Sequence, residues 1–166
     1  SLLLKLLDHI IIILYGDKLK FDEFQFGYQE NSSASLCSWI ALETIALYQR
    51  EGSTIYGCFM DCTKAFDTIQ QSLLFRKLLE AKIPPIIVRL LIQIYTKQTA
   101  DVRWQGKYSK EFRLSNGVRQ GSVLSPILFC FYMNGLFKLI RNSKNGCSIG
   151  TYYAGVFGYA DDLFLI

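Results

Sequence analysis

Two adjacent carboxylates, Asp161 and Asp162, lie inside an otherwise apolar and aromatic stretch, VFGYADDLFLI at residues 156–166. Neighbouring like charges repel each other, and burying a carboxylate without a partner is costly. A turn is the ordinary explanation, because Asp is a common turn residue. A third carboxylate, Asp61, ends the run TIYGCFMD at residues 54–61, which is typical of a buried strand. If antiparallel pairing brings Asp61 beside the other two, a catalytic site becomes the alternative explanation.

Three carboxylates in one small volume cannot all be ionised without compensation by a shared proton, a Lys or Arg side chain, or a divalent metal. Their hard oxygen atoms suit Mg²⁺ or Mn²⁺. Two such ions about 4 Å apart activate an attacking hydroxyl and stabilise a leaving phosphate oxygen. Phosphoryl transfer is therefore the chemistry that these residue types can support.

The composition suits one globular domain or two intertwined subdomains. The chain has 166 residues, 51% of them hydrophobic, and a net charge of +4, which permits a polyanionic partner without requiring one. Five cysteines without a CxxC pair, with a single His, argue against structural zinc, and their odd number favours a reducing, intracellular compartment. The apolar run at residues 10–15 is too short to span a bilayer, and no signal peptide is evident, so we expect no membrane partner.

Hydrophobic periodicity and turn residues divide the chain into mixed elements. The first helix has Leu and Ile on every face, so we expect it to be buried. Strands and helices do not alternate regularly, which predicts an α+β fold with an antiparallel sheet. We expect helices at 1–15, from Ser33 or Ser35 to 50, and at 70–81, 86–97 and 127–141. We expect a strand at 54–61, a hairpin at 100–114 around Gln105-Gly106, and two strands within 147–166. The segments 16–33 and 115–126 should be loops.

Four sequence blocks together resemble the reverse transcriptases of non-LTR (LINE-type) retrotransposons, in the right order over residues 24–166. CFMDCTKAFDTI at 58–69 resembles the first palm motif, NGVRQGSVLSPILF at 116–129 the Gln-Gly block, and FGYADD at 157–162 the acidic turn. QFGYQENSS at 25–33 is a weaker match to the fingers motif of these enzymes. The resemblance implies the fingers and palm of a right-hand polymerase without its thumb.

The resemblance also implies a subdivision of the chain. Because the sequence stops in mid-strand, we interpret it as a piece of a longer protein. Residues 1–166 would form one reverse transcriptase domain fragment, with 1–53 as a fingers part, 54–67 as the palm strand and first motif, 68–121 as fingers-side helices and hairpin, and 122–166 as the palm helix and acidic hairpin.

The resemblance assigns the metal-binding roles residue by residue. Asp61, Asp161 and Asp162 would be catalytic and hold two Mg²⁺ or Mn²⁺ ions, with Asp162 making less direct contact. The backbone oxygen of Cys62 would be a further ligand, while its side chain would be a small buried hydrophobe.

Nucleotide contacts are implied in the same way. Lys64 and Ala65 would offer backbone N–H groups to the triphosphate, and Phe66 would block a ribose 2′-hydroxyl unless it is simple core packing. Gln120 and Gly121 would lie beside the nascent base pair, unless they form an ordinary loop before a helix.

The remaining assignments concern template, primer and packing contacts. The possible template or primer contacts are Arg119, Tyr159 and Ala160. Asp67 would cap the next helix. Trp39 and Trp104 would be packing residues, although Trp104 has base stacking as an alternative.

The fingers block departs from the family at two positions. LINE enzymes commonly carry Arg after the Gly-aromatic pair and Gly two residues later, where this chain has Gln29 and Asn31. A cationic contact to template or phosphate would then be absent or come from Lys18, Lys20 or Arg50.

The leading functional hypothesis is RNA-directed DNA synthesis, in which a primer 3′-hydroxyl attacks the α-phosphate of a deoxynucleotide. The partners would be an RNA template, a DNA primer or target and a dNTP, while the sequence leaves the target site and oligomeric state open. Alternatives are a non-catalytic or decayed palm fragment that binds nucleic acid, and a group II intron-type maturase. We expect residues 1–166 alone to bind nucleic acid weakly and to be poorly active.

Overall fold

A computed structural model describes residues 2–166 and divides into two compact units. Unit 1 contains the chain up to Leu19 together with Lys64–Leu128, and unit 2 contains Lys20–Thr63 together with Phe129–Ile166. Each unit is therefore assembled from two separate parts of the chain. This grouping differs from the subdivision implied by the resemblance, which stays a prediction.

Unit 1 is mainly helical, with a β arm. Its helices are α1 (Leu2–Tyr15), the 3₁₀ turn η1 (Gly16–Lys18), α3 (Ala65–Thr68), α4 (Gln71–Glu80), α5 (Pro85–Thr96) and the beginning of α6 (Leu124–Asn142). Its strands are β2 (Thr99–Ala100), β3 (Arg103–Trp104), β4 (Lys107–Tyr108) and β5 (Phe112–Arg113). The core lies between α4 and α5, where the rings of Phe75 and Tyr95 meet edge to face at 6.2 Å. Pro85 opens α5, as expected for proline in a first helical turn.

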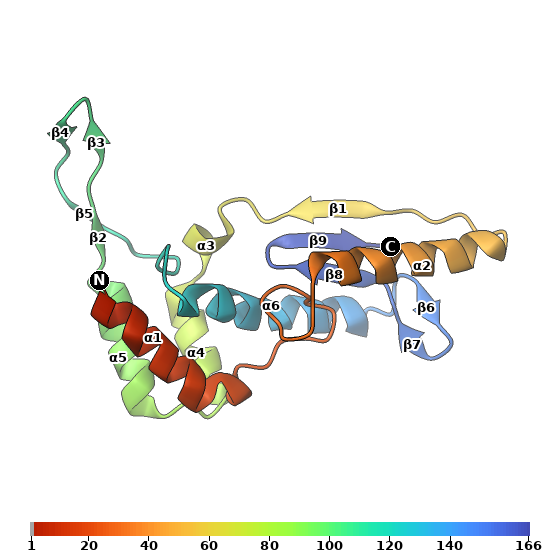
Figure 1. Ribbon diagram of the computed structural model, residues 1–166, viewed down its shortest axis with the longest axis horizontal. Coiled ribbons are helices and arrows are strands. Elements are labelled where there is room, and N and C mark those ends of the chain that lie inside the picture. The colour runs from red at the N-terminus through yellow and green to blue at the C-terminus, as the bar shows by residue number, and fades with distance from the viewer. Residues whose placement is uncertain (1) are drawn as a thin grey trace. The chain divides into compact units, whose positions relative to one another are not determined.

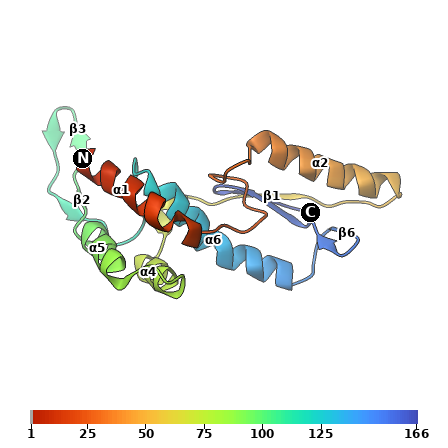
Figure 2. The same cartoon turned by 60° about the horizontal axis from the view of Figure 1, so that its bottom comes forward.

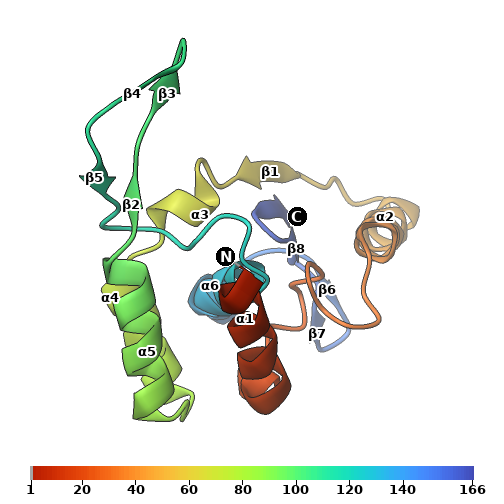
Figure 3. The same ribbon diagram turned by 60° about the vertical axis from the view of Figure 1, so that its left-hand side comes forward.

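The expected hairpin around Gln105-Gly106 is confirmed. β3 pairs with β4 and β2 pairs with β5, both antiparallel. Gln105 and Gly106 have φ values of 47° and 78°, as a two-residue type I′ turn requires. Figure 3 shows the two ladders as one arm that extends from the α4–α5 pair.

The expected burial of the first helix is wrong. α1 forms as predicted, but only Asp8 and Ile11 are buried, and Leu2, Leu3 and Ile13 are 77–85% exposed. Apolar residues on every face need partners on every face, and the described chain covers one narrow stripe of this helix.

Unit 2 is a three-stranded antiparallel sheet with helices against it. The sheet has the order β1 (Cys58–Asp61), β9 (Asp162–Leu165), β8 (Val156–Tyr159), and a small ladder joins β6 (Ser148–Ile149) to β7 (Tyr152–Tyr153). The last segment thus has four strands, where the sequence predicted two. α2 (Ala34–Arg50) begins at Ser33, whose side chain accepts a hydrogen bond from the Leu36 amide, so the predicted N-cap is confirmed.

The residues of β8 show which helix packs on each face of this sheet. Phe157 belongs to an apolar cluster that includes Ala41 of α2. A Cβ added to the next residue, Gly158, would lie 2.4 Å from the ring of Phe137 in α6. Because side chains alternate along a strand, α2 and α6 cover opposite faces, as Figures 1 and 2 show.

The strand ending at Asp61 is not buried, contrary to expectation. All four residues of β1 are exposed, and Phe59 is 84% exposed although its ring stacks on Phe164 at 4.3 Å. β1 is the edge strand of the sheet, and α2 makes its main contact with the sheet at β8, the other edge, which leaves β1 exposed within the described residues.

Two further expectations about packing are corrected. Trp39 on α2 is 60% exposed and Trp104 in the arm is 74% exposed, so neither is a core residue of the described chain. Within residues 2–166, no helix is both long enough and apolar enough to cross a membrane.

Candidate active site

The three carboxylates singled out in the sequence meet at one end of the unit 2 sheet. The β1–β9 register places Asp61 directly opposite Asp162, and the β8–β9 register places Tyr159 opposite Asp162 on the other side. Asp161 occupies the connecting turn, and its carbonyl accepts a hydrogen bond from the Cys62 amide at 3.3 Å. The predicted pairing of antiparallel strands is therefore what brings residues a hundred positions apart together.

The three carboxylates form no ion pair within the described chain. No Lys or Arg of residues 2–166 lies within ion-pair distance of Asp61, Asp161 or Asp162. The negative charges also affect a neighbouring thiol. Burial is the largest cause that raises the pKa of Cys62, and the charges of Asp161, Asp61 and Asp162 raise it further, in that order. Burial likewise raises the pKa of Cys130 to about 12, with a further contribution from Asp161.

The carboxylate oxygens of this site are of the type that divalent cations prefer, but their arrangement is not a complete metal site. No group of three His, Cys, Asp or Glu side chains within residues 2–166 converges tightly enough to hold an ion. The site does offer oxygen ligands of like charge, half-buried at Asp161 and exposed at Asp61 and Asp162. Such a cluster suits Mg²⁺, which keeps several waters and takes phosphate oxygens from its substrate.

Unit 1 holds the residues with expected nucleotide roles. The loop from Gly117 to Gly121 is tied to α3: the Val118 amide donates to the Phe66 carbonyl at 2.8 Å, and the Gln120 side chain donates to Asp67 Oδ1 at 3.0 Å. Asp67 thus holds Gln120 and does not cap α4, whose N-cap position, Gln70, makes no side-chain cap. The expectation of a cap is wrong, because a long-range partner engages this carboxylate.

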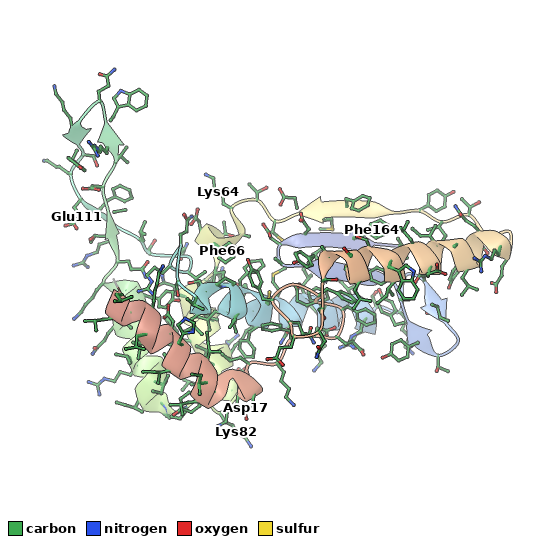
Figure 4. All side chains as sticks on the ribbon, in the orientation of Figure 1. Asp17, Lys64, Phe66, Lys82, Glu111 and Phe164 are labelled. Carbon is green, nitrogen blue, oxygen red and sulfur yellow. The ribbon has the colours of Figure 1, made fainter. Side chains whose placement is uncertain are left out.

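Lys64 precedes α3 with φ 52° and ψ 42°, a left-handed conformation that is uncommon for residues other than glycine. Figure 4 shows its side chain extending outward from this turn, with Phe66 on the helix beside it. Ala65 is buried and Phe66 is half-buried, whereas Gly121 is exposed with φ +75°.

A cavity of about 750 Å³ joins these elements within unit 1. Lys64, Arg113 and Arg119 line it together with one acidic residue, Asp67, which gives the wall a net positive charge. Arg113 has no counterpart among the sequence predictions. The sequence does not distinguish Arg113 from the other basic residues of the hairpin. Its place in the cavity wall becomes clear only in the structure, where β5 leads directly into the loop that contains Asn116.

Arg119 has a partner within unit 1. Its Nη2 lies 2.9 Å from Oδ2 of Asp8, a buried residue of α1 that also accepts a 2.7 Å hydrogen bond from Ser122. Its backbone carbonyl accepts a 2.7 Å hydrogen bond from Ser125. A template contact by Arg119 stays a prediction, and it would compete with this ion pair.

Tyr159 and Ala160 flank the acidic turn. Tyr159 is 40% exposed, whereas Ala160 is 8% exposed and has φ 57°. Their expected contacts with template or primer stay predictions.

Comparison with known proteins identifies the family. The family model described as reverse transcriptase (RNA-dependent DNA polymerase) matches residues 1–166. The chain belongs to the reverse transcriptase family. One relative is the retrovirus-related Pol polyprotein from the type-2 retrotransposable element R2DM of Drosophila melanogaster, which is 26% identical over 99% of this chain. Another is the retrovirus-related Pol polyprotein from the type-1 retrotransposable element R2 of Popillia japonica, which is 27% identical over 100% of this chain. The chain spans only 16% and 24% of the length of these two relatives.

The fold agrees with this family. A structure of telomerase from Candida albicans matches 98% of the chain and 29% of its own length, with a TM-score of 0.57 and 15% identity. The predicted α+β reverse transcriptase fold is confirmed, and so is the resemblance to non-LTR retrotransposon enzymes.

Proposed function

We propose that this chain is the fingers and palm part of an RNA-directed DNA polymerase of an R2-like retroelement, which adds deoxynucleotides to a primer 3′ end. The observation that carries the proposal is the β1–β9 register, which sets Asp61 opposite Asp162 beside the Asp161 turn in a chain of this family. An RNA template, a DNA primer and a dNTP are the partners that this activity requires.

The acidic end of the sheet is the proposed catalytic centre. Asp61 and Asp161, with the Cys62 backbone oxygen and a weaker contribution from Asp162, would hold two Mg²⁺ ions. When bound, the ions would supply activation of the primer hydroxyl and stabilisation of the pyrophosphate oxygen that leaves. The lack of an ion pair at these carboxylates within the described chain supports this assignment, since bound cations would offset the repulsion among the three charges.

The unit 1 cavity is the proposed nucleotide site. The backbone N–H groups of Lys64 and Ala65, at the start of α3, would bind the triphosphate, and the positive wall would attract it. Phe66 would lie under the sugar and exclude a 2′-hydroxyl. Gln120 and Gly121 would lie beside the base pair, with Gln120 oriented by its hydrogen bond to Asp67.

A primer-extension assay on an RNA template, with the full protein that carries this chain, tests the proposal. Asp61→Asn removes a metal-binding charge worth several kcal/mol of transition-state stabilisation, so we expect a loss of about 10³-fold or more in rate. Asp17→Asn is the matched control, because it makes the same charge change at an exposed residue of η1 in unit 1. Near-normal synthesis by Asp61→Asn would exclude the catalytic assignment.

A second measurement separates catalysis from binding. Mn²⁺ binding in the presence of dNTP, followed by electron paramagnetic resonance, should weaken in Asp61→Asn and not in Asp17→Asn. Nucleic-acid binding without any synthesis by the unaltered protein would favour the alternative of a non-catalytic palm.

A further inference from the structure

The turn that carries Asp161 is strained at the residue before it. Ala160 and Asp161 form a two-residue connection between β8 and β9, and Ala160 has φ 57°. This conformation is normally left to glycine, because a Cβ there is disfavoured sterically. Something else in the fold must hold Ala160 in place, since such strain persists only where surrounding contacts over-determine it.

A buried glutamine bonds both polar backbone groups of Ala160. Gln25 Oε1 accepts from the Ala160 amide at 2.8 Å, and Gln25 Nε2 donates to the Ala160 carbonyl at 3.0 Å. The same Oε1 accepts from the Gly27 amide at 2.9 Å. Gln25 is 0% exposed and Ala160 is 8% exposed, so the Gln25 amide has no water as an alternative partner and the Ala160 backbone is largely shielded from it.

The segment that carries Gln25 is itself fixed to β8. The Phe26 amide donates to the Gly158 carbonyl, and the Gly158 amide donates to the Phe24 carbonyl, each at 2.7 Å. Gln25 forms an isolated parallel β-bridge with Gly158, so the segment runs beside β8 like a short additional strand. The side chain of Gln25 therefore starts from a fixed backbone.

Gly27 allows the two segments to approach this closely. A Cβ at position 27 would lie 2.4 Å from the Ala160 nitrogen and 3.0 Å from its Cα. No side chain fits in that space, because the nearest atom belongs to the backbone of Ala160, and Gln25 Oε1, held by its own hydrogen bonds, also lies 3.0 Å away.

We propose that Gln25 is a positioning residue that locks the Ala160-Asp161 turn and thereby sets the direction of the Asp161 carboxylate. This role rests on the proposed function, because the direction of Asp161 matters only if its carboxylate takes part in synthesis. Without the Gln25 amide, both buried polar groups of Ala160 lose their partners, and the residue gains by relaxing toward negative φ. The alternative is that Gln25 stabilises unit 2 as any satisfied buried amide would.

Two substitutions distinguish these roles. Gln25→Met keeps the length and volume of the side chain but removes its hydrogen bonds, and we expect kcat for primer extension to fall at least 10-fold with less than a threefold change in KM for dNTP. Ala160→Gly relieves the backbone strain, so the loss caused by Gln25→Met should be at least threefold smaller in the Ala160→Gly background than in the Ala160 background. A purely structural Gln25 predicts the same loss in both backgrounds.

Amide hydrogen exchange supplies a readout that does not depend on activity. In Gln25→Met the Ala160 amide should exchange at least 10-fold faster, while the amides of the β1–β9 ladder keep their rates. Ala41→Gly, in α2 of the same unit, is the control for global loss of stability. At equal loss of Tm, it should leave kcat much less affected than Gln25→Met does.

The outcomes separate the two proposals. Unchanged kcat in Gln25→Met, or a loss equal to that of Ala41→Gly at equal Tm, would overturn the positioning role while DNA synthesis stands. If the unaltered protein synthesises no DNA, the proposed function and the catalytic part of this inference both fall. The exchange rate of Ala160 then still decides whether Gln25 locks the turn.

Discussion

Gly117→Ala should be far more damaging than Gly106→Ala, although both glycines have the same kind of backbone conformation. Their φ values are +85° and +78°. A Cβ at Gly117 would lie 2.7 Å from the Phe66 carbonyl oxygen and 2.8 Å from the Asp67 Cα, whereas a Cβ at Gly106 would meet nothing within 4 Å. The pair therefore separates the cost of backbone conformation from the cost of a steric clash.

The magnitudes follow from these contacts. Both variants carry the left-handed backbone penalty, about 1–2 kcal/mol. Only Gly117→Ala also meets backbone atoms, which cannot rotate away as a side chain would. Relieving the clash would separate the loop from α3 and break the 2.8 Å Val118–Phe66 bond and the 2.7 Å bond from the Gly117 amide to the Ile69 carbonyl. At about 0.5–1.5 kcal/mol each, these add about 1–3 kcal/mol.

Urea unfolding of both variants, with spectroscopic detection, measures the difference directly. We expect the free energy of unfolding to fall by about 2–5 kcal/mol for Gly117→Ala and by at most about 2 kcal/mol for Gly106→Ala. In primer extension, Gly117→Ala should also raise KM for dNTP, because the same loop carries Gln120. Equal losses of stability in the two variants would refute the close attachment of this loop to α3.

Three further predictions follow from the site. Asp61→Asn should not lower Tm in the absence of metal, because it relieves repulsion with Asp162, and a calorimetric scan showing a clear loss would contradict this. Phe66→Val should raise the ratio of ribonucleotide to deoxyribonucleotide incorporation, measured by competition, and an unchanged ratio would assign the ring to packing alone. Burial raises the pKa of Cys130 to about 12, so between about pH 9 and pH 12 the thiol ionises only on unfolding, and stability should decrease as the pH rises through this window. Cys130→Ala should therefore be relatively less destabilising at pH 10.5 than at pH 7 in urea titrations, by about 1–2 kcal/mol.

Local chemistry in the sequence predicted the elements well. Ser33 caps α2, Pro85 opens α5, and the Gln105-Gly106 turn closes the arm, all because a few neighbouring residues decide the backbone there. The sequence predicts the start of α6 at 127, three residues late, because Pro126 is typical of the end of a loop but lies in the first turn of the helix.

Burial was harder to predict, since it depends on what lies opposite. The apolar sequences of α1 and β1 both suggested a core, yet most of α1 and all of β1 are exposed within the described chain. Hydrophobicity gives the tendency to be covered, but the edge position of β1 is set by pairing with β9, a hundred residues away.

Most of the site could be found from residue types, and the part that could not depends on distant contacts. The three carboxylates stand out because charge is unusual in such strands. Gln25 does not stand out, because a single Gln between two Phe residues has no distinctive chemistry, and its partner Ala160 lies 135 positions away. The sequence also suggests a local role for Asp67 at the nearest helix, whereas its partner Gln120 lies 53 positions away.

The contacts around Gln25 also change the meaning of the departures in the fingers block. Gln25 and Gly27 of this block lie directly against Ala160 in the acidic turn, and both are present. Asn31 replaces the expected glycine but has φ 58°, a conformation that Asn tolerates better than most residues. Gln29, where an Arg was expected, is exposed. Neither departure falls at Gln25 or Gly27, so the hydrogen bonds of this block to the Ala160 backbone do not depend on positions 29 and 31, and the missing cationic contact to template stays a prediction.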